Sequence, residues 1–228
     1  AVDIYGLNMP FHIRKITLFK SVPSLEAFLF LCLFIFYMSV IWGCANGANR
    51  KLYISDYSSR LSYIISNISF CIPVVMPWLL LSVVADIVNL LPFDAPKRFL
   101  STTGGELIFF VSFLIIIAVF GPVMIQKLWR CKPVEEGKKR SDIEAICKKA
   151  GVGFADILYW PIFGSRMITA GVMGLVKRFR YILVTKSLLS LLEPEEVEAV
   201  IAPEAGHIKR HHLVFYLLFF LGYMLLAV

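Results

Sequence analysis

The apolar positions of the chain gather in four long runs separated by polar segments. These runs are Leu25–Trp42, Ser62–Leu91, Leu107–Ile125 and Leu213–Val228. A helix needs about 20 mostly apolar residues to cross the ~30 Å hydrocarbon core of a bilayer. The first three runs are long enough, and the fourth is truncated or barely sufficient. The pattern therefore predicts an integral membrane protein with about four transmembrane helices.

Between the third and fourth runs the apolar positions become sparser and follow a helical spacing. Ser141 and Glu144 have the S-x-x-E spacing of a capping box, which satisfies two backbone N–H groups at a helix start. The apolar positions that share one face of this helix are Ile143, Ile146, Cys147 and Ala150. Gly151 follows directly, and glycine commonly ends a helix. We expect an amphipathic helix that begins at Ser141 and ends near Ala150.

Three short apolar and aromatic runs come next and predict strands. They are Phe154–Trp160, Met167–Leu175 and Phe179–Thr185. Short runs rich in aromatic and β-branched residues are typical of strands. Thr185 or a neighbour can then cap a short helix that reaches Leu192.

A longer helix is expected to begin at Pro194. Proline suits the first helical turn, and the glutamates that follow it lie near the positive end of the helix dipole. The apolar spacing carries this helix to residues 210–212. Pro203 lies inside it, lacks an N–H and clashes with the carbonyl four residues earlier, at a cost of roughly 3 kcal/mol. We expect the helix to kink or restart at Pro203.

These elements divide the chain into three regions. Residues 1–125 form an amino-terminal membrane region with three candidate spans, and residues 126–212 form a small α+β domain. Residues 213–228 begin a fourth span that is truncated. The expected fold class is a mainly α membrane protein with about four transmembrane helices and a small α+β insert.

The charge distribution predicts an orientation and argues against one class of partner. The net charge is +7, and 15 of the 23 lysines and arginines lie in residues 126–212. Because basic loops stay on the cytoplasmic side, we expect the α+β insert there and the amino terminus outside. Basic residues beside a bilayer also attract anionic headgroups. No nucleic-acid-binding motif accompanies the charge, so we expect no nucleic-acid partner.

One acidic residue, Asp86, lies inside the second apolar run. A carboxylate within a span is costly and often functional, which leaves open a small transporter or channel subunit. Pro73 and Pro77 break the same run. Asp86 also lies near the end of the run, so that snorkelling toward the interface is an equally good interpretation. The five cysteines have no paired spacing and indicate no disulfide framework.

Residues 203–207 read P-E-A-G-H and contain most of a zinc-protease motif. In H-E-x-x-H, two histidines one helical turn apart hold the metal, and the glutamate deprotonates the metal-bound water. Glu204 and His207 keep this register, whereas Pro203 occupies the position of the first histidine. His207 and His211 also have i, i+4 spacing and could hold a transition metal. The competing interpretation places His211 and His212 simply at a helix end near the bilayer.

The sequence around the motif resembles one protein family. Residues 179–201 contain a strand, a threonine, a leucine-rich helix and a Pro-Glu-Glu helix start, and E-x-G-H follows at residues 204–207. This order resembles the membrane zinc metallopeptidases that include the CAAX prenyl proteases and the HtpX-type heat-shock proteases. The resemblance covers roughly residues 138–215, and the apolar runs on either side fit it.

The resemblance implies a cofactor and a set of site residues. Zinc is the expected cofactor, with His207 as one ligand and Glu204 as the general base. The family's third ligand is a glutamate on a later helix, and no residue of this sequence can be assigned to it. Residues 168–171 resemble the family's edge strand, where Thr169, Ala170 and Gly171 would bind a substrate peptide by strand addition. The family often has asparagine at the position of Thr169.

Two functions follow from these expectations. The first is a membrane-embedded zinc metalloendopeptidase that hydrolyses peptide bonds through metal-activated water, with little or no activity in this chain because of Pro203. The alternative is a pseudo-peptidase, a membrane scaffold that binds peptides without cutting them. The expected partners are a peptide or membrane-protein substrate and the lipid bilayer.

Overall fold

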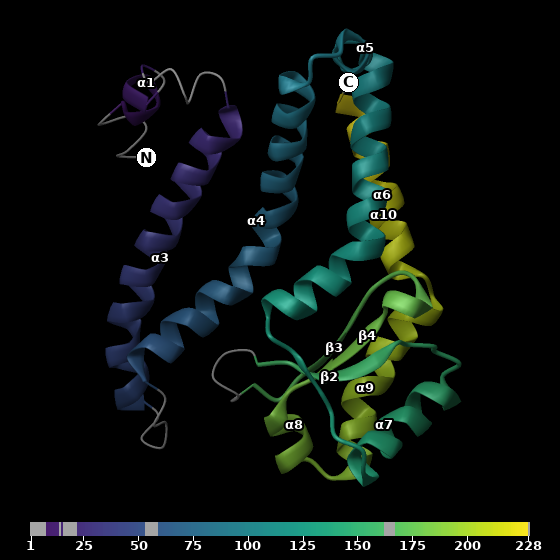
Figure 1. The fold of residues 1–228 in the computed structure, drawn as a ribbon. Helices are drawn as coiled ribbons and strands as arrows, with labels where there is room; N and C mark the ends of the chain where they lie inside the picture. The colour runs from purple at the N-terminus through teal and green to yellow at the C-terminus, as the bar shows by residue number, and fades with distance from the viewer. Residues whose placement is uncertain (1–7, 14, 16–21, 53–58, 162–166, 228) are drawn as a thin grey trace. The chain divides into compact units, whose positions relative to one another are not determined.

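The computed structural model describes residues 8–13, 15, 22–52, 59–161 and 167–227. Val228, the last residue of the fourth predicted span, lies outside these ranges. The chain divides into two compact units, Ala1–Glu106 and Leu107–Val228. Each unit is described by itself below, and Figure 1 labels most of the elements of both.

The first unit is built on two long helices that pack against each other, α3 (Pro23–Leu52) and α4 (Arg60–Leu90). Two short helices complete its described part, α1 (Met9–Ile13) and α5 (Asp94–Leu100). The segments Ser24–Ala48 and Arg60–Leu90 are long and apolar enough to cross a membrane, as the first two runs predict. Pro73 and Pro77 lie inside α4 without ending it.

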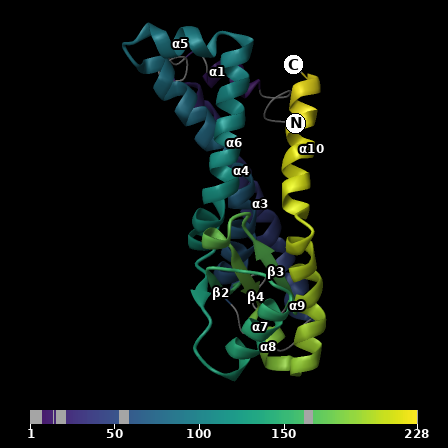
Figure 2. The ribbon, with the colours of Figure 1, turned by 90° about the vertical axis from the view of Figure 1, so that its right-hand side faces the viewer.

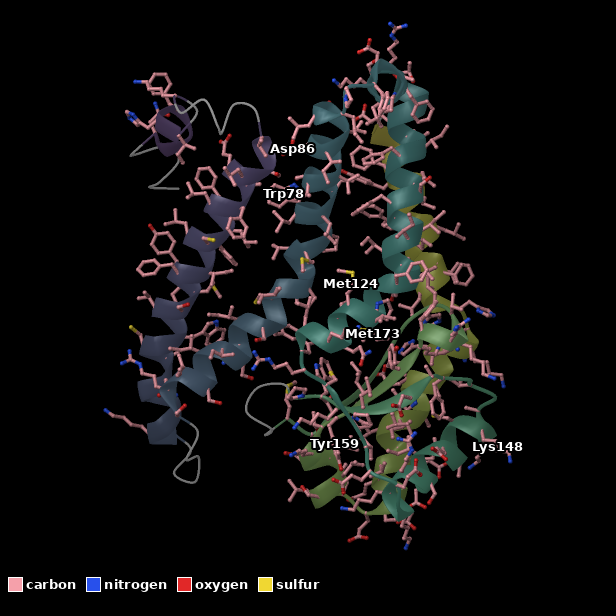
Figure 3. All side chains as sticks on the ribbon, in the orientation of Figure 1. Trp78, Asp86, Met124, Lys148, Tyr159 and Met173 are labelled. Carbon is pink, nitrogen blue, oxygen red and sulfur yellow. The ribbon has the colours of Figure 1, made fainter. Side chains whose placement is uncertain are left out.

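Asp86 of α4 is buried, with 7 % of its surface exposed. Its Oδ2 accepts a hydrogen bond of 2.7 Å from the backbone N–H of Ser24. That N–H belongs to the first turn of α3, where backbone donors have no partner within their own helix. Asp86 is therefore held inside the unit and joins α4 to the first turn of α3 (Figure 3).

The second unit begins within α6 (Thr103–Leu128), the most apolar of the three candidate spans. Figure 1 shows a bend in α6, and Pro122 accounts for it because a helix-interior proline removes one backbone hydrogen bond. At the other end of this unit is α10 (His212–Ala227), a shorter apolar helix. The chain is thus a membrane protein with three described helices long enough to span and a fourth that is shorter.

Between these helices lies a four-stranded sheet with strand order β1-β2-β4-β3. The strands are β1 (Lys132–Pro133), β2 (Asp156–Tyr159), β3 (Ala170–Met173) and β4 (Tyr181–Val184). β4 pairs in parallel with β2 and antiparallel with β3. The three predicted strands are confirmed, each shorter than its apolar run, and β1 was not predicted.

Three helices accompany the sheet: α7 (Lys138–Lys149), α8 (Lys186–Leu191) and α9 (Pro194–Lys209). α9 contacts both α7 and β3. The predicted apolar face of α7 is confirmed, since Ile143, Ile146 and Cys147 are all in the core. The predicted start is wrong. α7 begins three residues earlier, and the Ser141 hydroxyl donates to the carbonyl of Lys138 within the helix.

Two helix-end predictions are confirmed. Thr185 caps α8, and its Oγ1 accepts a hydrogen bond from the N–H of Leu188 at 3.3 Å. Gly151 follows α7 with φ of +71°, a left-handed conformation that glycine adopts without strain.

Candidate functional site

The helix α9 carries the residues of the incomplete zinc motif. Pro194 occupies its first turn, as the sequence predicts, and the Glu196 carboxylate accepts a 2.9 Å hydrogen bond from the N–H of Glu193. Val197, Ile201 and Ala205 are spaced four residues apart and are all buried. This apolar stripe fixes the rotation of α9 about its axis and leaves residues 203 and 207 on another face.

Pro203 is exposed in the middle of α9, and the helix continues unbroken through it. Of the two expected outcomes, a kink or a restart, the restart is therefore wrong, and the kink stays a prediction. The register from residue 203 to residue 207 is that of an ordinary helix, so a side chain at 203 shares a face with His207. Glu204 is half-buried beside them.

His207 is exposed and contacts a second histidine that sequence spacing did not indicate. Its Nδ1 lies 2.7 Å from Nδ1 of His212, and the two ring centroids are 4.8 Å apart. At this distance one nitrogen donates a proton and the other accepts it. The last turn of α9 is thereby joined to the first residue of α10.

The pairing with His212 exists because the helix ends earlier than expected. α9 stops at Lys209, and His211 has a left-handed φ of +54°. The carbonyl of His211 then accepts hydrogen bonds from the N–H groups of Val214 and Phe215 at the start of α10. His207 and His211 are therefore not on one continuous helix, so the i, i+4 geometry of the alternative metal pair is absent. His211 and His212 lie where α9 ends and α10 begins, as the helix-end interpretation expects. α10 then continues in nearly the direction of α9 (Figure 2).

The residues of this region do not fit a zinc site of the H-E-x-x-H type. Position 203 offers no donor atom, and His207 is bonded to His212 through one of its two ring nitrogens. Within the ranges that the structure describes, no three histidine, cysteine, aspartate or glutamate side chains gather into a metal-binding group. Lys209 and Arg210 add positive charge next to the site, which disfavours a cation.

The predicted peptide-binding residues, Thr169, Ala170 and Gly171, lie at the start of β3. Thr185, which directly follows β4, forms hydrogen bonds with Thr169. The N–H of Thr169 donates to the Thr185 hydroxyl oxygen at 3.2 Å, and the Thr169 carbonyl accepts from the N–H of Thr185 at 3.1 Å. Thr185 is fully buried. The backbone of Thr169 thus faces β4.

From Thr169 onward, the backbone N–H and C=O groups along β3 point alternately toward β4 and away from it. In an antiparallel pair, hydrogen-bonded and non-hydrogen-bonded positions alternate. Because Thr169 is hydrogen-bonded to β4, Gly171 and Met173 face the same way, whereas Ala170 and Val172 direct their N–H and C=O groups to the other side. In the described part of the sheet β3 is an edge strand, so these groups point away from β4.

The fold and the site define a class of protein. It is a membrane protein whose small α+β domain presents an E-x-x-H helix next to an edge strand, the arrangement of metallopeptidase domains. The family model of peptidase family M48 matches residues 133–228, from β1 to α10. For residues 133–228, this match supports the resemblance to the membrane zinc metallopeptidases. No curated protein matches the chain.

Sequence reasoning missed two residues of this region. His212 was taken for a helix-end residue, because five-residue spacing does not bring two side chains together on a continuous helix. Thr185 was expected only to cap a helix, yet it also holds Thr169. Its position directly after an apolar run and before a leucine-rich helix carries no signal for that second contact.

Proposed function

We propose that the chain has the framework of a membrane-embedded zinc metalloendopeptidase that, as its sequence stands, does not hydrolyse peptide bonds. The observation that carries this proposal is Pro203, four residues before His207 on an uninterrupted helix, where the family motif requires an imidazole. In an active relative, Glu204 would serve as the general base and His207 as a metal ligand. Here at most one histidine of the motif remains, and a catalytic zinc needs three protein ligands.

We further propose that a peptide or membrane-protein segment binds beside β3 as an added strand. The outward N–H and C=O groups of Ala170 and Val172 support this, because strand addition uses main-chain hydrogen bonds along an exposed sheet edge. Among the three residues expected from the resemblance, Ala170 would contact the peptide backbone directly. Thr169 and Gly171 would position the strand through β4. The positive-inside rule supports a cytoplasmic location for this domain, and we expect no nucleic-acid partner.

The first test is zinc content together with cleavage, measured on the full-length protein in detergent. The chain with Pro203 should carry negligible zinc, and Pro203→His should raise the zinc content measurably, because it restores the second imidazole of the motif. Because α9 is already unbroken at residue 203, the new imidazole needs no change of helix register. A zinc-loaded protein with Pro203 would refute the ligand argument.

Two matched variants separate metal binding from catalysis. Adding His207→Ala to Pro203→His should abolish the gain in zinc, since it removes the other imidazole. Adding Glu204→Gln should preserve zinc but abolish any cleavage that Pro203→His restores, because the amide cannot accept the proton from metal-bound water. Cleavage that survives Glu204→Gln would contradict the proposed role of Glu204.

The second candidate is a pseudo-peptidase that binds peptides without cutting them, and the intact edge of β3 favours it. Val172→Pro should weaken binding of an extended peptide, because it removes an outward N–H that the ladder with β4 does not use. Val172→Ala is the matched control for lost side-chain packing and should bind the peptide normally. Equal binding by both variants and the original chain would exclude strand addition at this edge.

A further inference from the structure

The segment from Gly174 to Arg180, which we term the 174–180 loop, connects β3 to β4 in a fixed shape. Gly174 has φ of +114°, and a Cβ there would lie 2.4 Å from the carbonyl oxygen of Phe179. The Arg180 guanidinium donates to the carbonyls of Gly174 at 3.1 Å, Leu175 at 2.5 Å and Gly153 at 2.9 Å. A planar fork that bonds three carbonyls leaves the loop little freedom.

This loop lies against the membrane-spanning helix of its own unit. The ring of Phe179 packs on Phe120 of α6, with centroids 5.2 Å apart. Phe120 directly precedes the bend at Gly121 and Pro122. The straight part of α6 before the bend, about 19 residues, is about 28 Å long and matches a ~30 Å hydrocarbon core. The loop therefore lies near the boundary between the hydrocarbon core and the headgroups.

A second ring contact supports the same placement. Trp129, just beyond the end of α6, lies against Trp160, just beyond β2, with centroids 5.2 Å apart. Tryptophan is enriched at the headgroup level of membranes. The α+β domain is thus joined to α6 on both sides of the bend.

The tip of the loop combines one apolar and two basic side chains. Val176 is 42 % exposed, and Lys177 and Arg178 are both exposed. Neither basic side chain has an ion pair or a hydrogen bond with any other residue that the structure describes. An exposed apolar residue beside uncompensated cations is the composition of segments that lie in the membrane interface.

We propose that the 174–180 loop binds an anionic phospholipid headgroup, with the lipid phosphate between Lys177 and Arg178 and Val176 in contact with the acyl boundary. The site is built from a stiff loop at a fixed depth beside α6, so it differs from the general attraction of a basic domain to an anionic surface. Lys148 of α7, by contrast, lies far from α6 (Figure 3). The binding would fix the domain, and with it β3 and α9, against one leaflet.

The test uses the full chain in nanodiscs of equal parts phosphatidylglycerol and phosphatidylcholine. The protein is released from the nanodiscs, and native mass spectrometry measures the ratio of the two lipids that stay bound to it. Lys177→Gln combined with Arg178→Gln should reduce the preference for phosphatidylglycerol between about five- and 25-fold, because each cation near an anionic surface contributes about fivefold. The matched control, Lys138→Gln combined with Lys148→Gln, removes the same charge from exposed positions of α7 and should change the ratio less than about twofold.

A third variant keeps the positive charge at both positions and exchanges the two residue types. Lys177→Arg combined with Arg178→Lys should retain the preference, since both positions stay positive. Thermal unfolding in pure phosphatidylcholine discs should be the same for all variants, because the exchanged side chains have no partners in the described part of the fold. The proposal is overturned if Lys177→Gln with Arg178→Gln keeps the lipid ratio of the original chain, or if the α7 control loses the preference equally.

Discussion

The buried hydroxyl of Thr185 is the contact most open to a quantitative test. Thr185→Val replaces the hydroxyl by a methyl group of similar size, so no cavity forms. The N–H of Leu188 loses its cap at 3.3 Å, which costs about 1 kcal/mol. The N–H of Thr169 loses its acceptor at 3.2 Å, which costs about 1–3 kcal/mol for a partly buried donor. We expect the start of β3 and α8 to be destabilised by about 2–4 kcal/mol in total.

Hydrogen exchange of backbone amides, measured by mass spectrometry in detergent, reports this loss locally. A loss of about 2–4 kcal/mol makes exchange in residues 167–173 and 186–191 roughly 30- to 700-fold faster, at tenfold per 1.4 kcal/mol. Thr169→Val is the matched control, because its hydroxyl makes only a 3.3 Å hydrogen bond to the adjacent carbonyl of Ala170. It should speed exchange less than about threefold. Unchanged exchange in Thr185→Val, or an equal change in the control, would refute the assignment of Thr185 as the residue that holds β3.

Two further predictions concern buried groups of the α+β domain. Burial, aided by the charge of Glu144, raises the pKa of the Cys147 thiol from 9.0 to about 11. As the pH rises, the thiol therefore loses its proton in the unfolded chain before it does so in the folded chain. The contribution of the protonated thiol to the free energy of unfolding is complete below pH 9 and is lost as the pH rises to 11. The thermal midpoint of unfolding should fall over that pH range, and Cys147→Ala should make the fall smaller. If the original chain and Cys147→Ala gave the same dependence of the midpoint on pH, the assigned role of the Cys147 thiol would be contradicted. Burial also lowers the pKa of Arg180. Arg180→Lys cannot reach three carbonyls, so amide exchange in residues 174–180 should rise at least about tenfold, whereas an unchanged rate would show that the loop is held by other contacts.

The candidate site shows how far local sequence patterns reach. Pro194 at a helix start, Thr185 as a cap and the apolar stripe through Ile201 were all predictable, because each depends on residues within one or two helical turns. The early end of α9 was not. His211 adopts a left-handed conformation without glycine, and histidine visits that region only occasionally. The contact between His207 and His212 follows from that single backbone angle.

The sheet shows the same limit at longer range. The apolar runs predicted three of its strands, yet neither the order β1-β2-β4-β3 nor the position of β3 at an edge can be derived from them. Strand order depends on which surfaces the helices cover, and α9 contacts β3 across more than 20 residues of sequence. The direction of the N–H groups of Ala170 and Val172 depends in turn on the bond between Thr169 and Thr185.

The sequence by itself determined that this is a membrane protein, where its long apolar helices lie, and that the motif of its zinc-peptidase helix lacks a histidine at Pro203. Hydropathy and residue identity are local properties, so no fold was needed to establish these points. The tertiary structure decided that α9 passes through Pro203 without a break, that His207 pairs with His212, and that Asp86 joins two helices. It also decided that Phe179 packs on Phe120 and brings a basic loop beside α6. Each of these contacts joins residues from different elements, and only the packing of those elements brings them within reach.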